Sequence, residues 1–129
     1  MHNKFIAAGA LLAALAVALG AFGAHGLKNF AEEETIKTFQ TAVQYQMYHA
    51  LALIFTGILY EKHSTRLIQV AGWFFISGIL LFSGSLYLLT FLKATETVGL
   101  NKFGLITPFG GLSFIMGWGC LILTFWQRK

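Results

Sequence analysis

The residues from Phe5 to Ala24 form a run of twenty residues without a charged side chain. An α-helix rises 1.5 Å per residue, so this run is about 30 Å long, which matches the hydrocarbon core of a bilayer. In lipid the backbone must satisfy its own hydrogen bonds, and only helices and closed barrels do so. Barrel strands alternate in hydrophobicity over about ten residues, whereas this run is continuously apolar. The run therefore predicts a transmembrane helix.

A cleaved signal peptide is the alternative for this first run. Lys4 would be its basic start, and Ala21 and Gly23 would be the small residues before the cut. The apolar part of a signal peptide usually has about 7–15 residues. Because the run is longer than that, we favour a retained helix.

Further apolar runs along the chain predict an all-α fold, an integral membrane four-helix transmembrane bundle in a single domain over residues 1–129. We expect spans at about 5–25, 43–60, 67–92 and 104–126, with an amphipathic extension at about 30–42 that rides along the membrane surface. Asn29 and Glu32 resemble a helix cap with its reciprocal acid, so the second helix is expected to begin near Phe30. Thr107 and Pro108 fit the N-cap and first position of the last helix.

The composition agrees with a membrane protein. The chain is 57% hydrophobic and only 11% charged, whereas a soluble domain has about 25% charged residues. Its net charge of +4 comes from basic residues that stand singly near the ends of the apolar runs. This pattern suits lipid headgroups and not a nucleic acid. The single cysteine, Cys120, excludes an internal disulfide.

The basic residues also suggest an orientation. Four spans put both termini on one side of the membrane. That side carries five basic residues (Lys4, Lys62, Arg66, Arg128, Lys129), and the opposite side carries four (Lys28, Lys37, Lys93, Lys102). The positive-inside rule therefore favours a cell-membrane protein with both termini in the cytoplasm.

Small residues recur every three or four positions and predict close helix packing. The first helix has Gly9, Ala13, Ala16, Gly20 and Gly23, and the last has Gly110, Ser113, Gly117, Cys120 and Thr124. The third helix pairs Ser77 with Gly84 and Gly78 with Ser85. The second carries Ala42, Tyr45, His49, Ala52 and Thr56. These stripes should face other helices.

The last of these stripes places His49 on an inward face. An ionisable residue at membrane depth is a functional-site hypothesis by default. The topology brings other polar side chains to the same, outer half of the bundle. The expected polar cluster comprises His25, Gln44, Gln46, His49, Ser83, Ser85 and Thr107.

Three interpretations of this cluster compete. The first is hydrogen bonding between helices. The second is a pocket for a small or amphipathic ligand, such as a lipid headgroup or a quinone. The third, ligation of a haem or metal by His25 and His49, is the weakest, because no thiolate or carboxylate joins the two imidazoles. We therefore expect no cofactor and no metal.

Catalysis has little support in the sequence. Ser83 and His49 could form a nucleophile–base pair, but no third member is visible, and every acidic residue lies in an expected loop or interfacial segment.

We expect a protein that is not an enzyme, an accessory or binding protein that uses the polar cluster. The alternative is a small oligomeric transporter or channel. The expected partners are membrane lipids, a partner membrane protein or further copies of the chain, with no nucleic acid.

Four segments carry a resemblance to a known family. They are Gly20–Gly26 (GAFGAHG), Thr41–His49 (TAVQYQMYH), Phe82–Tyr87 (FSGSLY) and Ile106–Gly111 (ITPFGG). In this order they resemble the YgdD/YwdK-like family of small bacterial membrane proteins, a domain of unknown function. The resemblance implies a cell-membrane protein with four spans and no established activity. Its motifs contain all seven residues of the expected polar cluster.

Overall fold

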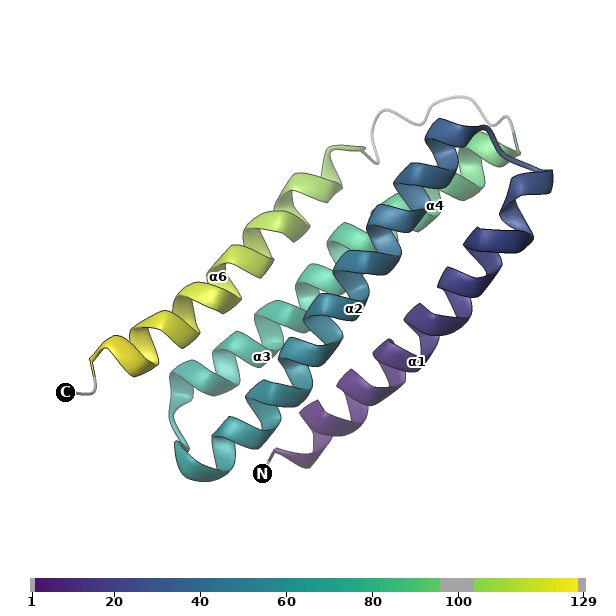
Figure 1. The fold of residues 1–129 in the computed structure, drawn as a ribbon. Coiled ribbons are helices and arrows are strands. Elements are labelled where there is room, and N and C mark those ends of the chain that lie inside the picture. The colour runs from purple at the N-terminus through teal and green to yellow at the C-terminus, as the bar shows by residue number, and fades with distance from the viewer. Residues whose placement is uncertain (1, 96–103, 128–129) are drawn as a thin grey trace.

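The computed structural model describes residues 2–95 and 104–127, and this part of the chain is helical throughout apart from short links (Figure 1). The elements in chain order are α1 (Asn3–His25), the 3₁₀ turn η1 (Leu27–Asn29), α2 (Glu33–Lys62), α3 (Arg66–Gly78), the π-helical turn η2 (Ile79–Ser83), α4 (Gly84–Ala94) and α6 (Ile106–Trp126). Because α3, η2 and α4 follow one another without a break, they form one rod.

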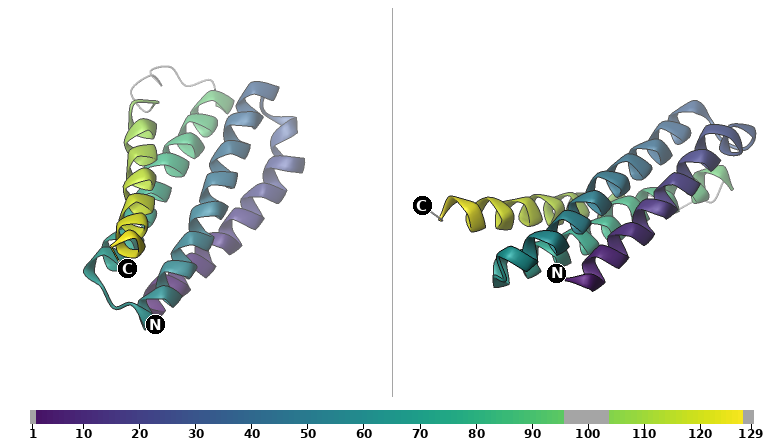
Figure 2. Two further views of the ribbon diagram at one scale, coloured as in Figure 1. Left: turned by 60° about the vertical axis from the view of Figure 1, so that its left-hand side comes forward. Right: turned by 60° about the horizontal axis from the view of Figure 1, so that its bottom comes forward.

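The helices lie side by side in the order α1, α2, the α3–α4 rod and α6 (Figures 1 and 2). Neighbours along the chain run in opposite directions. The start of α1, the link from α2 to α3 and the end of α6 therefore share one end of the molecule. Helix α2 packs against both α1 and the α3–α4 rod, while α6 packs mainly on α3 and η2.

Glycines bring α1 and α2 into close contact. A Cβ atom added at Gly9 would lie 2.7 Å from the Ala50 carbonyl oxygen of α2. A Cβ at Gly57 would lie 3.1 Å from the His2 carbonyl oxygen at the other end of the same interface. Of the five residues in the expected stripe of α1, Gly9, Ala16 and Gly23 are buried, and Ala13 and Gly20 are partly buried.

The stripe of α6 is confirmed in full. All five of its members are buried: Gly110, Ser113, Gly117, Cys120 and Thr124. Gly110 faces the backbone of Phe82 in η2, and a Cβ at Gly117 would lie 3.3 Å from the Ala71 carbonyl oxygen of α3. The small residues therefore set how close α6 comes to the α3–α4 rod.

The π turn changes the register of the third rod. The Gly84 N–H donates to the Ile79 carbonyl five residues back, whereas an α-helix would use a carbonyl four residues back. As a result Ser77 and Ser85, eight residues apart, both reach α6, through Ser113 and Thr107. A Cβ atom added at Gly84, the residue expected on the same face as Ser77, would meet no atom of another described helix within 4 Å.

Two helix starts differ from expectation. Helix α2 begins at Glu33 and not near Phe30, because η1 occupies the preceding residues and Glu32 takes the cap position. Helix α6 begins at Ile106, so Thr107 is not its cap. Its hydroxyl pairs with Ser85 instead, and Pro108 lies within the first turn, where a missing N–H is tolerated.

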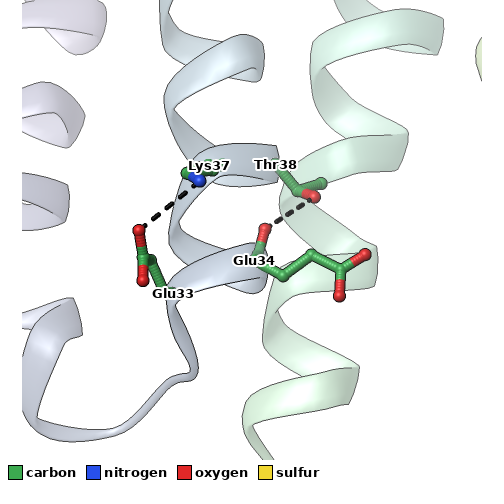
Figure 3. A network of polar contacts seen from close by, with 4 residues as sticks. All are labelled: Glu33, Glu34, Lys37 and Thr38. Carbon is green, nitrogen blue, oxygen red and sulfur yellow. Dashed lines mark hydrogen bonds and ion pairs between the residues drawn. The ribbon is translucent and has the colours of Figure 1, made fainter.

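The stretch expected as a surface extension, from about residue 30 to 42, is part of α2 from Glu33 onward and continues along the same axis (Figure 1). It is buried on one side through Thr35, Phe39 and Ala42. On its exposed side Lys37 and Glu33 form the ion pair that their spacing predicts, with 3.4 Å between Nζ and Oε1 (Figure 3). Such an exposed pair adds little stability.

Three rods are long and apolar enough to cross a membrane: Asn3–Asn29, Arg66–Ala94 and Ile106–Trp126. Their outward faces carry large apolar side chains, for example Val17, Trp73 and Ile122, each more than 60% exposed. Helix α2 is not among the three, because polar residues such as Gln44 and Gln46 lower the hydropathy of its uncharged part.

We predict that Gly9→Ala destabilises the fold by about 1–3 kcal/mol, because the added methyl group must push α1 away from the Ala50 carbonyl. The measurement is the unfolding midpoint of the purified chain in a mild detergent. Gly119→Ala is the matched control, since a Cβ there meets nothing within 4 Å. It should leave the midpoint unchanged or raise it slightly. Equal effects of the two substitutions would contradict the close contact of α1 and α2.

Candidate functional site

Gln46 links three helices through its side-chain amide. It lies on α2 and is 3% exposed. Its Nε2 donates to the Leu12 carbonyl of α1 at 2.8 Å, and its Oε1 accepts from the Tyr87 hydroxyl of α4 at 2.6 Å. The amide thus uses both its donor and its acceptor side inside the bundle.

Ser83 makes a second link, from η2 to α2. Its side chain is fully buried, and its hydroxyl donates to the Ala42 carbonyl at 2.7 Å. The hydroxyl therefore points to a backbone oxygen and not to His49. The conceivable Ser83–His49 nucleophile–base pair is not formed.

His49 is held between α2 and α6. The Trp118 indole N–H can only donate, and it donates to Nε2 of His49 at 3.2 Å. Nδ1 lies 2.7 Å from the Tyr45 carbonyl oxygen and donates to it. This assigns the neutral imidazole with its proton on Nδ1. The ring also stacks on Phe114, with 3.5 Å between ring centroids.

Ser85 and Thr107 belong to the contact between the third rod and α6. Their hydroxyl groups lie 2.6 Å apart, and Ser85 also reaches the Phe82 carbonyl oxygen at 2.9 Å. Ser77 and Ser113 form a similar hydroxyl pair farther along the same two helices. These pairs act as interhelical hydrogen bonds at small residues.

His25 and Gln44 do not join the other five residues of the expected cluster. Both are exposed, and neither bonds to the others in the described part of the chain. His25 is the last residue of α1. Gln44 lies two residues from Ala42 and from Gln46, and two residues turn an α-helix by about 200°. It therefore points away from the face that these two residues bury.

The two histidines are also too far apart to share a metal or haem iron. His25 ends α1 beside the start of α2, whereas His49 lies sixteen residues beyond Glu33, which corresponds to about 24 Å along the helix. Within residues 2–95 and 104–127, no three His, Cys, Asp or Glu side chains come together as metal ligands would.

A groove opens between α2 and α6 beside His49. We call it the α2–α6 groove; its volume is about 650 Å³, and it is lined by Tyr45, His49, Phe82, Pro108, Gly111, Leu112, Phe114, Ile115 and Trp118. The Tyr45 side chain is 39% exposed. Its hydroxyl makes no hydrogen bond to another described residue. A separate, smaller cavity of about 260 Å³ shares Trp118 with the groove and is also lined by Phe55.

No pattern in the sequence places Trp118 and Phe114 in a site with His49. Both lie on α6, four residues apart, and both rings contact the imidazole. The spacing shows that the two rings share a face, but not which helix that face meets. Tyr87 lies two residues after Ser85, and its bond to Gln46 depends on the approach of α4 to α2.

We predict that Gln46→Leu and Tyr87→Phe each lower the free energy of unfolding by about 1–2 kcal/mol, because each breaks the same buried hydrogen bond. The double variant should lose less than the sum, with a coupling of about 0.6 kcal/mol or more. Unfolding in detergent measures all three variants. Gln44→Leu, at an exposed position of the same helix, should be close to neutral. Strictly additive losses would exclude the Gln46–Tyr87 bond.

Comparison with known proteins identifies relatives over nearly the whole chain. The family model described as "Protein of unknown function (DUF423)" matches residues 19–111. The chain is 43% identical over 120 residues to the UPF0382 membrane protein YwdK of Bacillus subtilis (strain 168), covering 92% of this chain and 93% of that protein. It is 39% identical over 120 residues to a UPF0382 membrane protein of Haemophilus influenzae, covering 92% and 90%.

A Staphylococcus aureus relative, the UPF0382 membrane protein SAB0533, is 43% identical over 119 residues, which covers 92% of each chain. No solved structure matches. The matched region contains η1, α2 and the α3–α4 rod, and with them Gln46, His49 and Ser83. The identity and coverage confirm the family resemblance seen in the sequence. The chain is a membrane protein of the DUF423/UPF0382 family.

Proposed function

We propose that the chain crosses the cell membrane four times, with both termini in the cytoplasm, and binds a lipid-soluble molecule in the α2–α6 groove without catalysing a reaction. The observation that carries the binding proposal is the groove itself. It lies between α2 and the first half of α6 and combines aromatic walls with the hydroxyl of Tyr45.

The position of α2 beside α1 supports a fourth crossing. Phe39 of α2 packs against Gly23 near the end of α1, and Gly57 lies opposite Ile6 near its start. The eighteen residue steps between Phe39 and Gly57 correspond to about 27 Å, close to the thickness of the hydrocarbon core. If α1 crosses the membrane, α2 crosses it too, in the opposite direction.

The basic residues support the orientation. Lys4, Lys62 and Arg66 lie at the end of the bundle that also holds the end of α6, while Lys28, Lys37 and Lys93 lie at the other end. In the sequence, Arg128 and Lys129 follow α6, whereas Lys102 falls between α4 and α6, which makes five basic residues against four. The positive-inside rule favours the first end for the cytoplasm.

The groove has the composition of a small-molecule site. Such sites are mostly apolar and aromatic, with a few polar groups that fix orientation. Tyr45, Phe82, Phe114 and Trp118 supply four rings, and the Tyr45 hydroxyl supplies a hydrogen bond. Because the groove opens sideways between membrane helices, its ligand would enter from the lipid. A molecule with a flat ring and a carbonyl group, such as a quinone, fits this chemistry.

The hydrogen bonds of His49 and Ser83 argue against catalysis. Both nitrogens of His49 have partners, and the hydroxyl of Ser83 is taken by a backbone carbonyl. The acidic residues of the described segments are Glu32, Glu33, Glu34 and Glu61, and all are exposed at the ends of helices. A reaction would need a base or nucleophile beside the groove that is ready to react.

Single-cysteine labelling tests the four crossings. In a Cys120→Ser background, we expect Asn29→Cys to react with a membrane-impermeant maleimide in intact cells. Ser64→Cys should react only after the cells are opened, because α2 carries the chain to the other side. Labelling of both positions from the same side would exclude a crossing by α2. The reverse pattern would keep the crossing and contradict the orientation.

Fluorescence of Trp118 tests the groove. With Trp73→Phe and Trp126→Phe in the background, a decyl-benzoquinone should quench Trp118 in a saturable way. Gly111→Leu should abolish the saturable part, because it fills the groove where an added Cβ has room, 3.9 Å from Phe82. Tyr45→Phe should weaken binding by about three- to tenfold, the worth of one hydrogen bond.

Gly119→Leu is the matched control for this test, since it lies on α6 outside the groove and an added Cβ there meets nothing within 4 Å. It should bind the quinone like the parent chain. If quenching in the parent chain rose linearly with the quinone concentration, or if Gly111→Leu left the saturable quenching unchanged, a quinone site in the groove would be ruled out.

A further inference from the structure

The side of α2 that faces out of the molecule carries a seven-residue repeat. Its exposed residues follow one another at alternating steps of four and three positions: Gln44, Tyr48, Leu51, Phe55 and Ile58. The last four of these side chains are between 46% and 65% exposed. We call these five residues the outer face of α2. Their spacing is the one with which two parallel helices pack side by side in a coiled coil.

The outer face lies opposite the contacts that α2 makes inside the bundle. Gln44, Leu51 and Phe55 each precede a buried residue by two positions, and two residues turn an α-helix by about 200°. Both α1 and the α3–α4 rod pack against the buried side of α2. The outer face is therefore free to meet another molecule.

Gln44 has no partner for its amide at this face. Its side chain is exposed and makes no hydrogen bond within residues 2–95 and 104–127. It lies five residues beyond Phe39, which packs against Gly23 near the end of α1, and five residues correspond to about 7.5 Å. If α2 crosses the membrane as proposed above, this amide lies within the hydrocarbon core. An amide without a hydrogen bond is strongly unfavourable there, so a polar group should cover it.

We propose that a second copy of the chain supplies this group, so that the protein forms a dimer with α2 packed against α2. Copies of one chain insert into the membrane in the same orientation. Their two-fold axis then runs along the membrane normal, and equivalent residues of two parallel helices meet. A side-chain amide both donates and accepts, so the two Gln44 side chains bond to each other. One polar residue in an otherwise apolar repeat also fixes the register of the two helices.

The flanks of the outer face agree with such a pair. Lys37 continues the repeat seven residues before Gln44, where two copies would bring like charges together. Its ion pair with Glu33, with 3.4 Å between Nζ and Oε1, reduces that repulsion (Figure 3). The α2–α6 groove lies on the side of α2 that carries Tyr45 and His49. The interface therefore does not need a ligand in the groove.

Disulfide cross-linking of the full chain in native membranes tests the dimer. In a Cys120→Ser background, oxidation should join Leu51→Cys into a product of twice the mass of the chain. Leu11→Cys is the matched control, because it is 62% exposed on α1 at nearly the same level, close to the contact of Gly9 with Ala50. It should remain a monomer. If Leu51→Cys cross-linked no better than Leu11→Cys, or only to a protein of another mass, the proposal would be overturned.

Substitution of Gln44 tests the bond between the copies. Gln44→Leu should raise the dissociation constant of the dimer about tenfold, measured by sedimentation equilibrium in a density-matched mild detergent. Gln40→Leu makes the same change near the membrane surface, where water satisfies the amide, and should change the constant by less than about twofold. Equal effects of the two substitutions would exclude the Gln44 contact.

Two further readings separate this proposal from those on which it rests. Gln44→Leu should leave the unfolding of separate chains in excess detergent unchanged, so a weaker dimer would not reflect a damaged fold. If the maleimide labelling showed that α2 does not cross the membrane, the crossing and the dimer would both be excluded. If the crossing held and Leu51→Cys stayed monomeric, only the dimer would be excluded.

Discussion

Close approach of helix backbones at small residues is the contact on which the rest of this structure depends. Gly9 and Gly57 let α1 lie against α2, and Gly110 and Gly117 let α6 lie against the α3–α4 rod. In a bilayer the lipid tails are as apolar as the side chains, so helices associate through packing and interhelical bonds. Once α1 and α2 are this close, the carbonyl group of Leu12 comes within reach of Gln46. Between α2 and the α3–α4 rod the small residue is Ser83 itself, whose hydroxyl reaches the Ala42 carbonyl.

The groove lies where this close packing stops. Helices α2 and α6 meet through rings, with His49 stacked on Phe114 and bonded to Trp118. Rings of this size hold two helices apart and leave space beside them, whereas glycine and serine close it. The same molecule therefore has tight, hydrogen-bonded seams around α2 and an open side next to α6. The His49–Trp118 bond fixes one wall of that open side. His49 therefore both joins two helices and lines the candidate site.

Of the seven residues of the expected cluster only His49 lines the α2–α6 groove, so spacing in the sequence predicted the buried polar links and not the groove. Gln46 and His49 lie on the helix that carries a stripe of small residues, and this stripe predicts that the two side chains point inward. Their burial confirms the prediction. Ser83, Ser85 and Thr107 are engaged as polar links, but Ser83 and Ser85 face different helices, because two residues turn a helix by about 200°. The sequence does not show which of the two faces α2 and which faces α6. His25 and Gln44 lie outside the cluster, because nearness to one end of a bundle does not decide which way a side chain points.

The sequence by itself determined the helical class, the approximate limits of the rods and the faces that pack, because these depend on hydrophobic length and on a period of three to four residues. The sequence also showed which family the chain belongs to. Only the tertiary structure decided which faces meet, that Trp118 and Tyr87 are the partners of His49 and Gln46, and where the groove lies. Those features depend on residues 41 to 69 positions apart in the chain, and periodicity along one helix holds no information about its neighbour.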